Sequence, residues 1–339
     1  MTTAPTDIDL ARFGVQPTDE GAHPCDPDVE WWNESWFWDW YDAGGEHAGH
    51  CRIGMHPNQG RVWVWFYLKH GDEWVCVEEP RLPHASFDPA RLAYDGWGLR
   101  FSWEPTAPLR TGRFRFQGFG RVLSGPRVGQ IQAVSADLEV EAMGPPHAPK
   151  KMDAHAGTVK YPASRFEQPV SYRGTTAIAG ESVAFEGRGE RDHSWGPRFW
   201  NMEWTFLVVN GERIRSQCAN VDIPGVPRIG TGYLYRGDAF EELAEVELDV
   251  EVEGRPVLDP VAGTLRWKTE AGEELRGTVE SLSGIEIDLT HTFTPPQRSL
   301  YRRGLVRVRL EGEAEPLTGW LEFNRLREPT DGGPREAAE

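Results

Sequence analysis

One stretch of the chain brings titratable side chains, indoles and glycines together within fourteen positions: Gly187–Trp200, with the sequence GRGERDHSWGPRFW. As a strand, it places Arg191, His193 and Trp195 on one face and Asp192 on the other. Neither face has the apolar alternation of a core strand. A His and an Asp on a rigid element can exchange protons with a substrate in a partly dry cavity. The alternative is a buried His–Asp pair that only holds two sheets together.

Glycine and proline define the limits of this strand. Gly187 and Gly189 allow another backbone or a ligand to approach closely, and Gly196-Pro197 ends the strand just beyond Trp195. Strand ends are where pockets open in all-β proteins. We therefore expect the reactive side chains at such an opening.

A second candidate region is the tryptophan-rich segment at 31–42, WWNESWFWDWYD. Period two puts Trp32, Glu34, Trp36, Trp38, Trp40 and Asp42 on one side of a strand. Burial among indoles raises the pKa of a carboxyl group toward that of a proton donor, and indole faces attract a nearby carbocation. The alternative is a strand whose aromatics form the core while its acids reach solvent.

The third candidate region is a hairpin around Asn210-Gly211, a dipeptide typical of a two-residue loop. Pairing of 198–209 with 212–222 gives a polar face and an aromatic packing face. The polar face carries Asn201, Glu203, Ser216, Asn220 and Asp222. It either meets solvent or lines a polar part of a barrel lumen, where Asp222 is the candidate carboxyl group.

Composition restricts the class of protein. The chain has 339 residues, enough for two domains, and a net charge of −17 that disfavours nucleic acid or an anionic membrane surface as main partner. The four cysteines have no CxxC spacing and the first residues resemble no leader, so we expect a cytoplasmic protein with free thiols. No apolar run is long enough to span a membrane. Peripheral membrane contact remains open, as does the choice between monomer and homodimer.

Patterning predicts an all-β fold. Nearly every segment alternates with period two between turn residues, as in two antiparallel β-barrels or sandwiches. A Pro-rich and basic stretch puts the boundary near 165, giving domains 1–165 and 166–328 and a disordered tail at 329–339. Fifteen tryptophans fit either an aromatic-walled cavity for a large apolar ligand or an aromatic-rich core.

Signals for cofactors and metals are weak. His47, His50, Cys51 and His56 match no standard zinc framework. The chain has no P-loop, dinucleotide fingerprint, GxSxG or HExxH motif. We therefore predict neither cofactor nor metal.

The segment at 187–198, the Trp-rich stretch ending Tyr41-Asp42 and the closing Thr318–Arg325 (TGWLEFNR) together resemble the carotenoid 1,2-hydratase (hydroxyneurosporene synthase)-like superfamily. The resemblance implies two lipocalin-like β-barrels and cofactor-free hydratase or cyclase chemistry. It also implies that His193 and Trp195 face the site and that Asp222 supplies a carboxyl group. The sequence departs from the hydratases at Asn220, where their pattern has Tyr, and its surroundings are closer to uncharacterised members.

These observations predict a cofactor-independent lyase or isomerase, meaning a hydratase, dehydratase or cyclase, for a hydrophobic unsaturated substrate such as a terpenoid, steroid or polyketide. The predicted catalytic residues are His193, Asp222, Asp192 and Trp195. The predicted substrate-binding residues are Glu34, Trp36, Trp38, Tyr41, Arg191, Arg198, Trp200, Asn201, Glu203 and Asn220. The alternative function is a non-catalytic carrier of a lipid or another hydrophobic ligand.

Overall fold

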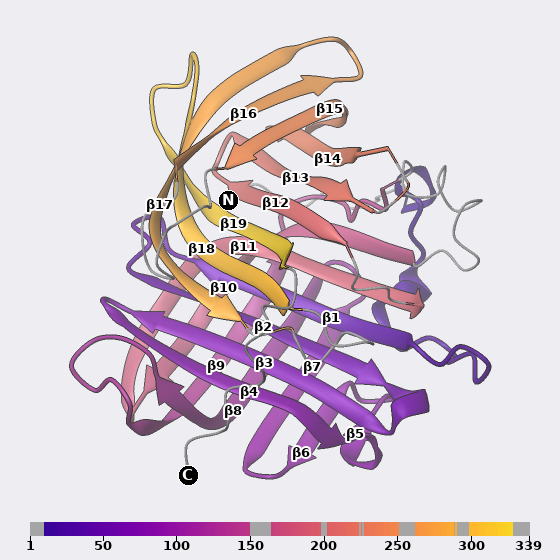
Figure 1. Cartoon of the computed structure of the whole chain (residues 1–339), viewed down its shortest axis with the longest axis vertical. Helices are drawn as coiled ribbons and strands as arrows, with labels where there is room; N and C mark the ends of the chain where they lie inside the picture. The colour runs from indigo at the N-terminus through magenta and orange to yellow at the C-terminus, as the bar shows by residue number, and fades with distance from the viewer. Residues whose placement is uncertain are drawn as a thin grey trace. The chain divides into compact units, whose positions relative to one another are not determined.

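The structure is a computed structural model that describes residues 10–149, 164–197, 202–223, 225, 227–250, 262–287, 289 and 298–327. These residues form nineteen strands and four short 3-10 helices joined by turns, which confirms the all-β prediction (Figure 1). None of the helices in the described ranges is long and apolar enough to cross a membrane. All four cysteines are free thiols, as predicted.

The first eleven strands form one sheet with the order β4-β3-β2-β1-β11-β10-β9-β8-β7-β6-β5. A further pairing of β4 with β8 joins the two sides of this sheet. The strands are β1 (Trp32–Tyr41), β2 (His47–His56), β3 (Arg61–His70), β4 (Glu73–Pro83), β5 (Phe87–Asp88), β6 (Ala93–Gly96), β7 (Leu99–Ala107), β8 (Thr111–Val122), β9 (Ile131–Ala142), β10 (Ser164–Ile178) and β11 (Glu181–Pro197). The 3-10 helices are η1 (Leu10–Phe13), η2 (Pro17–Glu20), η3 (Pro57–Gln59) and η4 (His84–Ser86).

Aromatic side chains fill the inside of this sheet. β8 shows the reason most clearly, because its buried Phe114 and Phe116 alternate with residues that are more exposed. Trp38 packs against Phe114 and Trp103 with ring centroids 5.2 and 5.5 Å apart. Many of the chain's tryptophans are therefore core residues of the first sheet.

Two glycines let β11 lie against β1. A Cβ atom on Gly189 would be only 1.9 Å from the carbonyl oxygen of Asp39, and one on Gly187 would be 2.3 Å from that of Tyr41. The close approach that the sequence predicts here is thus made by the backbone of β1. This contact fixes the register in which Trp36 pairs with His193 and Glu34 with Trp195.

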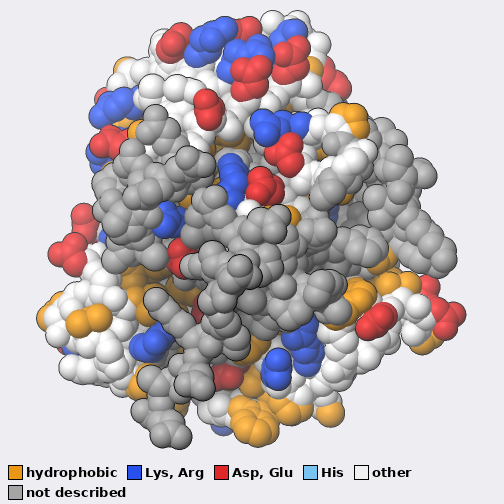
Figure 2. Space-filling model, in the orientation of Figure 1, with side chains coloured by type: hydrophobic (Ala, Val, Ile, Leu, Met, Phe, Trp, Pro, Cys, Tyr) orange, Lys and Arg blue, Asp and Glu red, His pale blue; other side chains and the backbone are white. Residues whose placement is uncertain are grey.

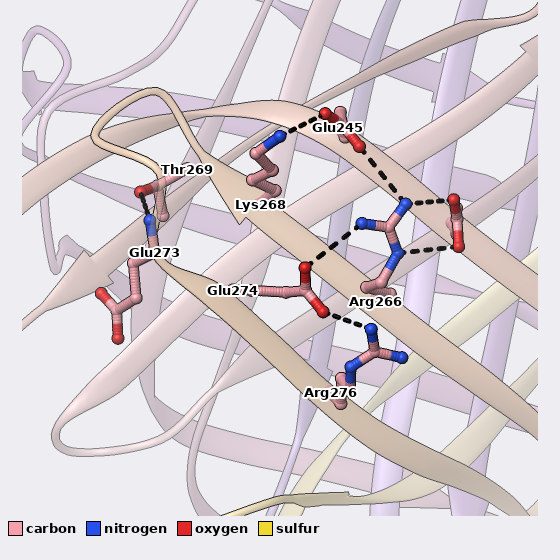
Figure 3. Close-up of polar contacts among 8 residues, drawn as sticks. Glu245, Arg266, Lys268, Thr269, Glu273, Glu274 and Arg276 are labelled. Carbon is pink, nitrogen blue, oxygen red and sulfur yellow. Dashed lines mark hydrogen bonds and ion pairs between the residues drawn. The ribbon is translucent and has the colours of Figure 1, made fainter.

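The last eight strands form a closed barrel in sequence order. They are β12 (Glu203–Asn210), β13 (Ile214–Asp222), β14 (Ile229–Arg236), β15 (Ala239–Val250), β16 (Ala262–Thr269), β17 (Glu274–Ile287), β18 (Arg298–Leu310) and β19 (Leu317–Arg327). On the outer face of β15 to β17, Arg266 pairs with Glu245, Glu247 and Glu274 (Figure 3). Figure 2, drawn in the same orientation as Figure 1, shows acidic and basic side chains beside one another over these strands.

The prediction of a two-residue loop at Asn210-Gly211 is wrong. β12 continues through Asn210 and β13 begins at Ile214, so three residues separate the strands. The reason is that Asn210 is buried: its backbone N–H donates to the Tyr41 hydroxyl at 2.8 Å and its side chain donates to the Gly189 carbonyl at 2.7 Å. These contacts hold Asn210 in the strand.

Contacts divide the described residues into two compact units. One contains those within Met1–Arg198, Val209–Ser216 and Tyr235–Phe240, and the other contains those within Phe199–Val208, Gln217–Leu234 and Glu241–Glu339. β10 and β11 thus group with the first sheet. The domain limits of 1–165 and 166–328 stay a prediction, and the tail at 329–339 lies outside the described residues.

Candidate active site

β1 and β11 lie side by side and bring the two main candidate segments together (Figure 1). The ring of Trp36 stacks on His193 with centroids 4.6 Å apart, and Trp195 lies 4.9 Å from the same imidazole. Phe166 of β10 meets His193 edge-on. The imidazole of His193 is therefore enclosed by aromatic rings on the face that the sequence predicts.

Glu34 is the centre of the polar contacts in this enclosure. Its Oε1 atom lies 3.0 Å from Nε2 of His193 and 2.8 Å from Nδ1 of His23, and it also accepts the backbone N–H of His23 at 2.8 Å. The side chains of Glu34 and His193 are each only 1% exposed. One buried carboxylate oxygen thus meets two imidazoles.

The protonation of His193 follows from its second contact. Nδ1 of His193 lies 2.7 Å from the backbone carbonyl oxygen of Asp19, which can only accept, so Nδ1 carries a hydrogen. Nε2 then faces the carboxylate of Glu34 at hydrogen-bond distance. Two lone pairs would repel each other there, so one further proton lies between Nε2 and Oε1. The His193–Glu34 pair holds a proton in a dry, aromatic environment.

His23 connects this pair to the surface. Its side chain is half-buried and its ring stacks flat on Trp195, with centroids 3.8 Å apart. Burial lowers the pKa of His23, but the hydrogen bond and charge of Glu34, helped by Asp19, outweigh it, so the pKa lies above its usual value. Burial likewise raises the pKa of Glu34, and the hydrogen bonds from His193 and His23 bring it below its usual value.

A second buried carboxylate fixes the same strand. Glu20 forms a bidentate pair with Arg191 at 2.7 and 3.0 Å, and it accepts from the Trp103 indole at 2.8 Å. Arg191 also donates to Gln168. Burial raises the pKa of Glu20, but the charge of Arg191 and the hydrogen bonds lower it below its usual value. The predicted substrate-binding residue Arg191 is thus engaged by protein groups.

The short helix η2 carries the two residues that contact His193 and Arg191 of β11. Asp19 and Glu20 are neighbours in η2, and they hold His193 and Arg191, which are two residues apart on β11. The carboxylate of Asp19 is itself fixed, because it accepts the backbone N–H of Gln16 at 2.8 Å. η2 therefore positions the imidazole of His193 from outside the sheet.

The remaining predicted residues of the first unit lie away from this cluster or in the core. Asp192 points to the opposite face of β11, where Arg165 pairs with it at 3.3 Å. Trp38 is buried in the aromatic core. Tyr41 is buried and accepts the backbone N–H of Asn210, and burial raises the pKa of its hydroxyl well above its usual value. The structure does not bring these three side chains to Glu34.

The predicted residues of the hairpin lie in the second unit. Asp222 is partly exposed and pairs with Arg228 at 2.8 Å. The side chain of Glu203 accepts from the backbone of Leu326, and Asn220 is buried in the barrel. Arg198, Trp200 and Asn201 lie outside the described residues. The catalytic role of Asp222 stays a prediction.

Sequence reasoning missed three site residues: Asp19, Glu20 and His23. All three lie in a segment without strand periodicity. About half of the chain separates this segment from β11 in the sequence. The available signal was weak: two adjacent acids and a histidine before Pro24 in an otherwise irregular stretch. Tertiary packing alone reveals their role.

The same atoms form a possible metal-ligand set. Among the described residues, the ligand atoms of His23, Glu34 and His193 lie within 4.8 Å of one another. The four residues considered from spacing, 47, 50, 51 and 56, do not form such a set. A metal-ligand geometry is therefore found where no sequence motif predicts one.

Comparisons with known proteins show the fold and the family. A family model described as Domain of unknown function (DUF7064) matches residues 16–327. An AttH-like protein of Nitrosomonas europaea has a TM-score of 0.59 at 14% identity and covers 91% of this chain and 95% of its own. CghA, crystallised with Sch210972, has a TM-score of 0.54 at 12% identity and covers 92% and 95%. No curated protein sequence matches this chain.

Proposed function

This chain belongs to the DUF7064 family, and we propose that it is a lyase or isomerase that transfers protons to and from a hydrophobic unsaturated substrate. The observation that carries the proposal is the buried carboxylate of Glu34, whose Oε1 lies 3.0 Å from His193 Nε2 and 2.8 Å from His23 Nδ1 among aromatic rings. The fold shared with CghA, which was crystallised with Sch210972, is consistent with a ligand-binding role.

The exposure of the side chains indicates the route of the proton. His193 and Glu34 are buried, whereas His23 and Trp195 are only partly buried. A substrate therefore meets His23 and Trp195 first. Because Glu34 Oε1 accepts from both imidazoles, it stabilises the protonated form of His23, which can give its Nε2 proton to the substrate and keep the proton on Nδ1.

In the hydration direction, the π electrons of a C=C bond take this proton and the neighbouring carbon becomes cationic. The indole face of Trp195 stabilises the positive charge. The oxygen of water forms the new C–O bond, and one proton of that water returns to Nε2 of His23. Dehydration is the reverse sequence, and in a cyclisation an internal π bond replaces water as the nucleophile.

Comparison of wild type with His193→Gln tests the proposal. Both proteins are incubated with a panel of isoprenoid, steroid and polyketide alkenes and alcohols, and the extracts are analysed by mass spectrometry. We expect a product that differs by one water, or an isomer, in wild type only. Unchanged thermal unfolding of the variant shows that the fold is kept.

The alternative function, a carrier of a hydrophobic ligand, rests on the wealth of buried aromatic side chains. It predicts that wild type and His193→Gln retain the same unaltered compound from the panel. That result would overturn the proposal of catalysis.

A further inference from the structure

We propose that His23, Glu34 and His193 also bind a divalent transition-metal ion, which takes the place of the proton in the His193–Glu34 pair. The observation is the convergence of two imidazole nitrogens and one carboxylate oxygen within 4.8 Å, contributed by the loop after η2, by β1 and by β11. Two imidazoles and a carboxylate suit Zn²⁺, Fe²⁺ and related ions.

Two of the three separations between the ligand atoms fit such an ion. Glu34 Oε1 lies 2.8 Å from His23 Nδ1 and 3.0 Å from His193 Nε2. With metal–ligand bonds of about 2.1 Å, these separations correspond to angles of about 85–90° at the metal. The nitrogens of His23 and His193 lie within 4.8 Å of each other, and bonds of about 2.1 Å to one ion would bring them to about 4.2 Å or less. The three protein ligands would therefore lie on one side of the ion and leave its other coordination positions open for water or another small ligand.

The outer nitrogens of both imidazoles have the partners that metal-bound histidines require. Nδ1 of His193 donates to the backbone carbonyl oxygen of Asp19, which directs the lone pair of Nε2 toward Glu34. Nε2 of His23 lies 3.4 Å from Oδ1 of the same Asp19, which directs the lone pair of Nδ1 to the same point. Asp19 thus orients both ligands, and it is a positioning residue for the metal.

This inference goes beyond the proposed function, because one space between Nε2 and Oε1 cannot hold a proton and a metal ion together. A bound ion occupies the lone pair on Nδ1 of His23, so the ring is no longer an imidazolium that can give up its Nε2 proton. We therefore expect the metal-bound protein to be inactive in proton transfer and the chelator-treated protein to be active.

Binding is tested on the full chain after chelator treatment, with Zn²⁺ by calorimetry and with Co²⁺ by its visible absorption spectrum. We expect one ion per chain in wild type. His23→Gln, whose side chain is half-buried on a loop, should weaken binding about 100-fold or more. Asp19→Ala should weaken it about 10- to 100-fold, as removal of an outer partner does at other metal sites.

The matched control is His47→Asn. His47 also contacts a carboxylate, with Nδ1 2.9 Å from Asp42 Oδ2, but it is not part of the three-ligand set. Its replacement should leave binding unchanged. Absence of binding in wild type, or equal binding by wild type and His23→Gln, would overturn the metal site.

Activity separates this inference from the proposed function. If metal binding fails, the comparison of wild type with His193→Gln still decides whether proton transfer occurs. If chelated protein turns over and Zn²⁺ stops it, both proposals are supported. If turnover requires the added ion, the metal site stands and the inhibitory role assigned to the ion is overturned.

Discussion

Two carboxylates, one in each unit, contact aromatic side chains or their neighbours but have different partners: Glu34 is buried, whereas Glu322 is partly buried. Glu34 in the first unit contacts the imidazoles of His193 and His23. Glu322 of β19 accepts from the Trp204 indole at 2.7 Å and pairs with Arg303, whose guanidinium lies over Trp320 at 5.0 Å. Imidazole gains and loses a proton near neutral pH, whereas a guanidinium remains charged. Because of these partners, Glu34 is suited to proton transfer and Glu322 to a structural role.

The largest effect is expected from the pair of variants Glu34→Gln and Glu322→Gln. Glu34→Gln removes the negative charge that stabilises both protonated imidazoles, so turnover should fall about 100- to 10,000-fold. Glu322→Gln should leave turnover within about twofold in protein that remains folded, because Arg303 transfers no proton. The measurement is product formation per folded chain. Equal losses in the two variants would contradict the distinction between the carboxylates.

Stability is expected to depend strongly on the Glu20–Arg191 pair beside the site. Glu20→Gln leaves Arg191 buried without its counter-charge, which typically costs about 3–5 kcal/mol of unfolding free energy. Urea denaturation at pH 7 measures this loss. A loss well below about 1 kcal/mol would show that η2 does not hold β11.

The same pair gives the chain a defined response to acid. Burial raises and Arg191 lowers the pKa of Glu20, and the net pKa in the folded protein lies below the ordinary value of 4.5. The stabilisation is fully present above pH 4.5 and is lost as the pH falls through the lowered pKa. The stability difference between wild type and Glu20→Gln should therefore shrink between pH 5 and pH 3. A difference that is constant over this range would contradict the lowered pKa.

The contact of β1 with β11 is expected to have an intermediate effect. A methyl group at Gly189 would meet the carbonyl oxygen of Asp39, so Gly189→Ala should cost about 1–3 kcal/mol of unfolding free energy and disturb the pairing of Trp36 with His193. Both stability and turnover should decrease. Unchanged turnover would show that the site tolerates a shift of β11.

Much of the fold could be predicted from the sequence, because period-two alternation and turn residues report local structure directly. The faces on which Glu34 and His193 lie followed from the period of two of a strand, once these segments were taken as strands. The Asn210-Gly211 loop failed because burial of Asn210 outweighs its turn preference. Asp19 and Glu20 were missed because their partners His193 and Arg191 lie 174 and 171 residues away, and His23 was missed because its partner Glu34 lies in another element.

The smallest effect is expected from the exposed ion pairs on the second barrel. Arg266 contacts three carboxylates on β15 and β17, but these groups are solvated and screened by salt (Figure 3). Arg266→Ala should leave turnover unchanged and barely move the denaturation midpoint. A large loss of stability would show that surface charges matter more here than the buried pairs.

The most direct test of the central claim is the ¹⁵N NMR spectrum of the histidine side chains in chelator-treated protein, with His193→Gln to assign the signals. We predict that Nδ1 of His193 carries a hydrogen and that a second, strongly deshielded proton lies between Nε2 and Glu34 and is lost in Glu34→Gln. A His193 ring protonated on Nε2 alone would contradict the account, because Nδ1 could not then donate to Asp19.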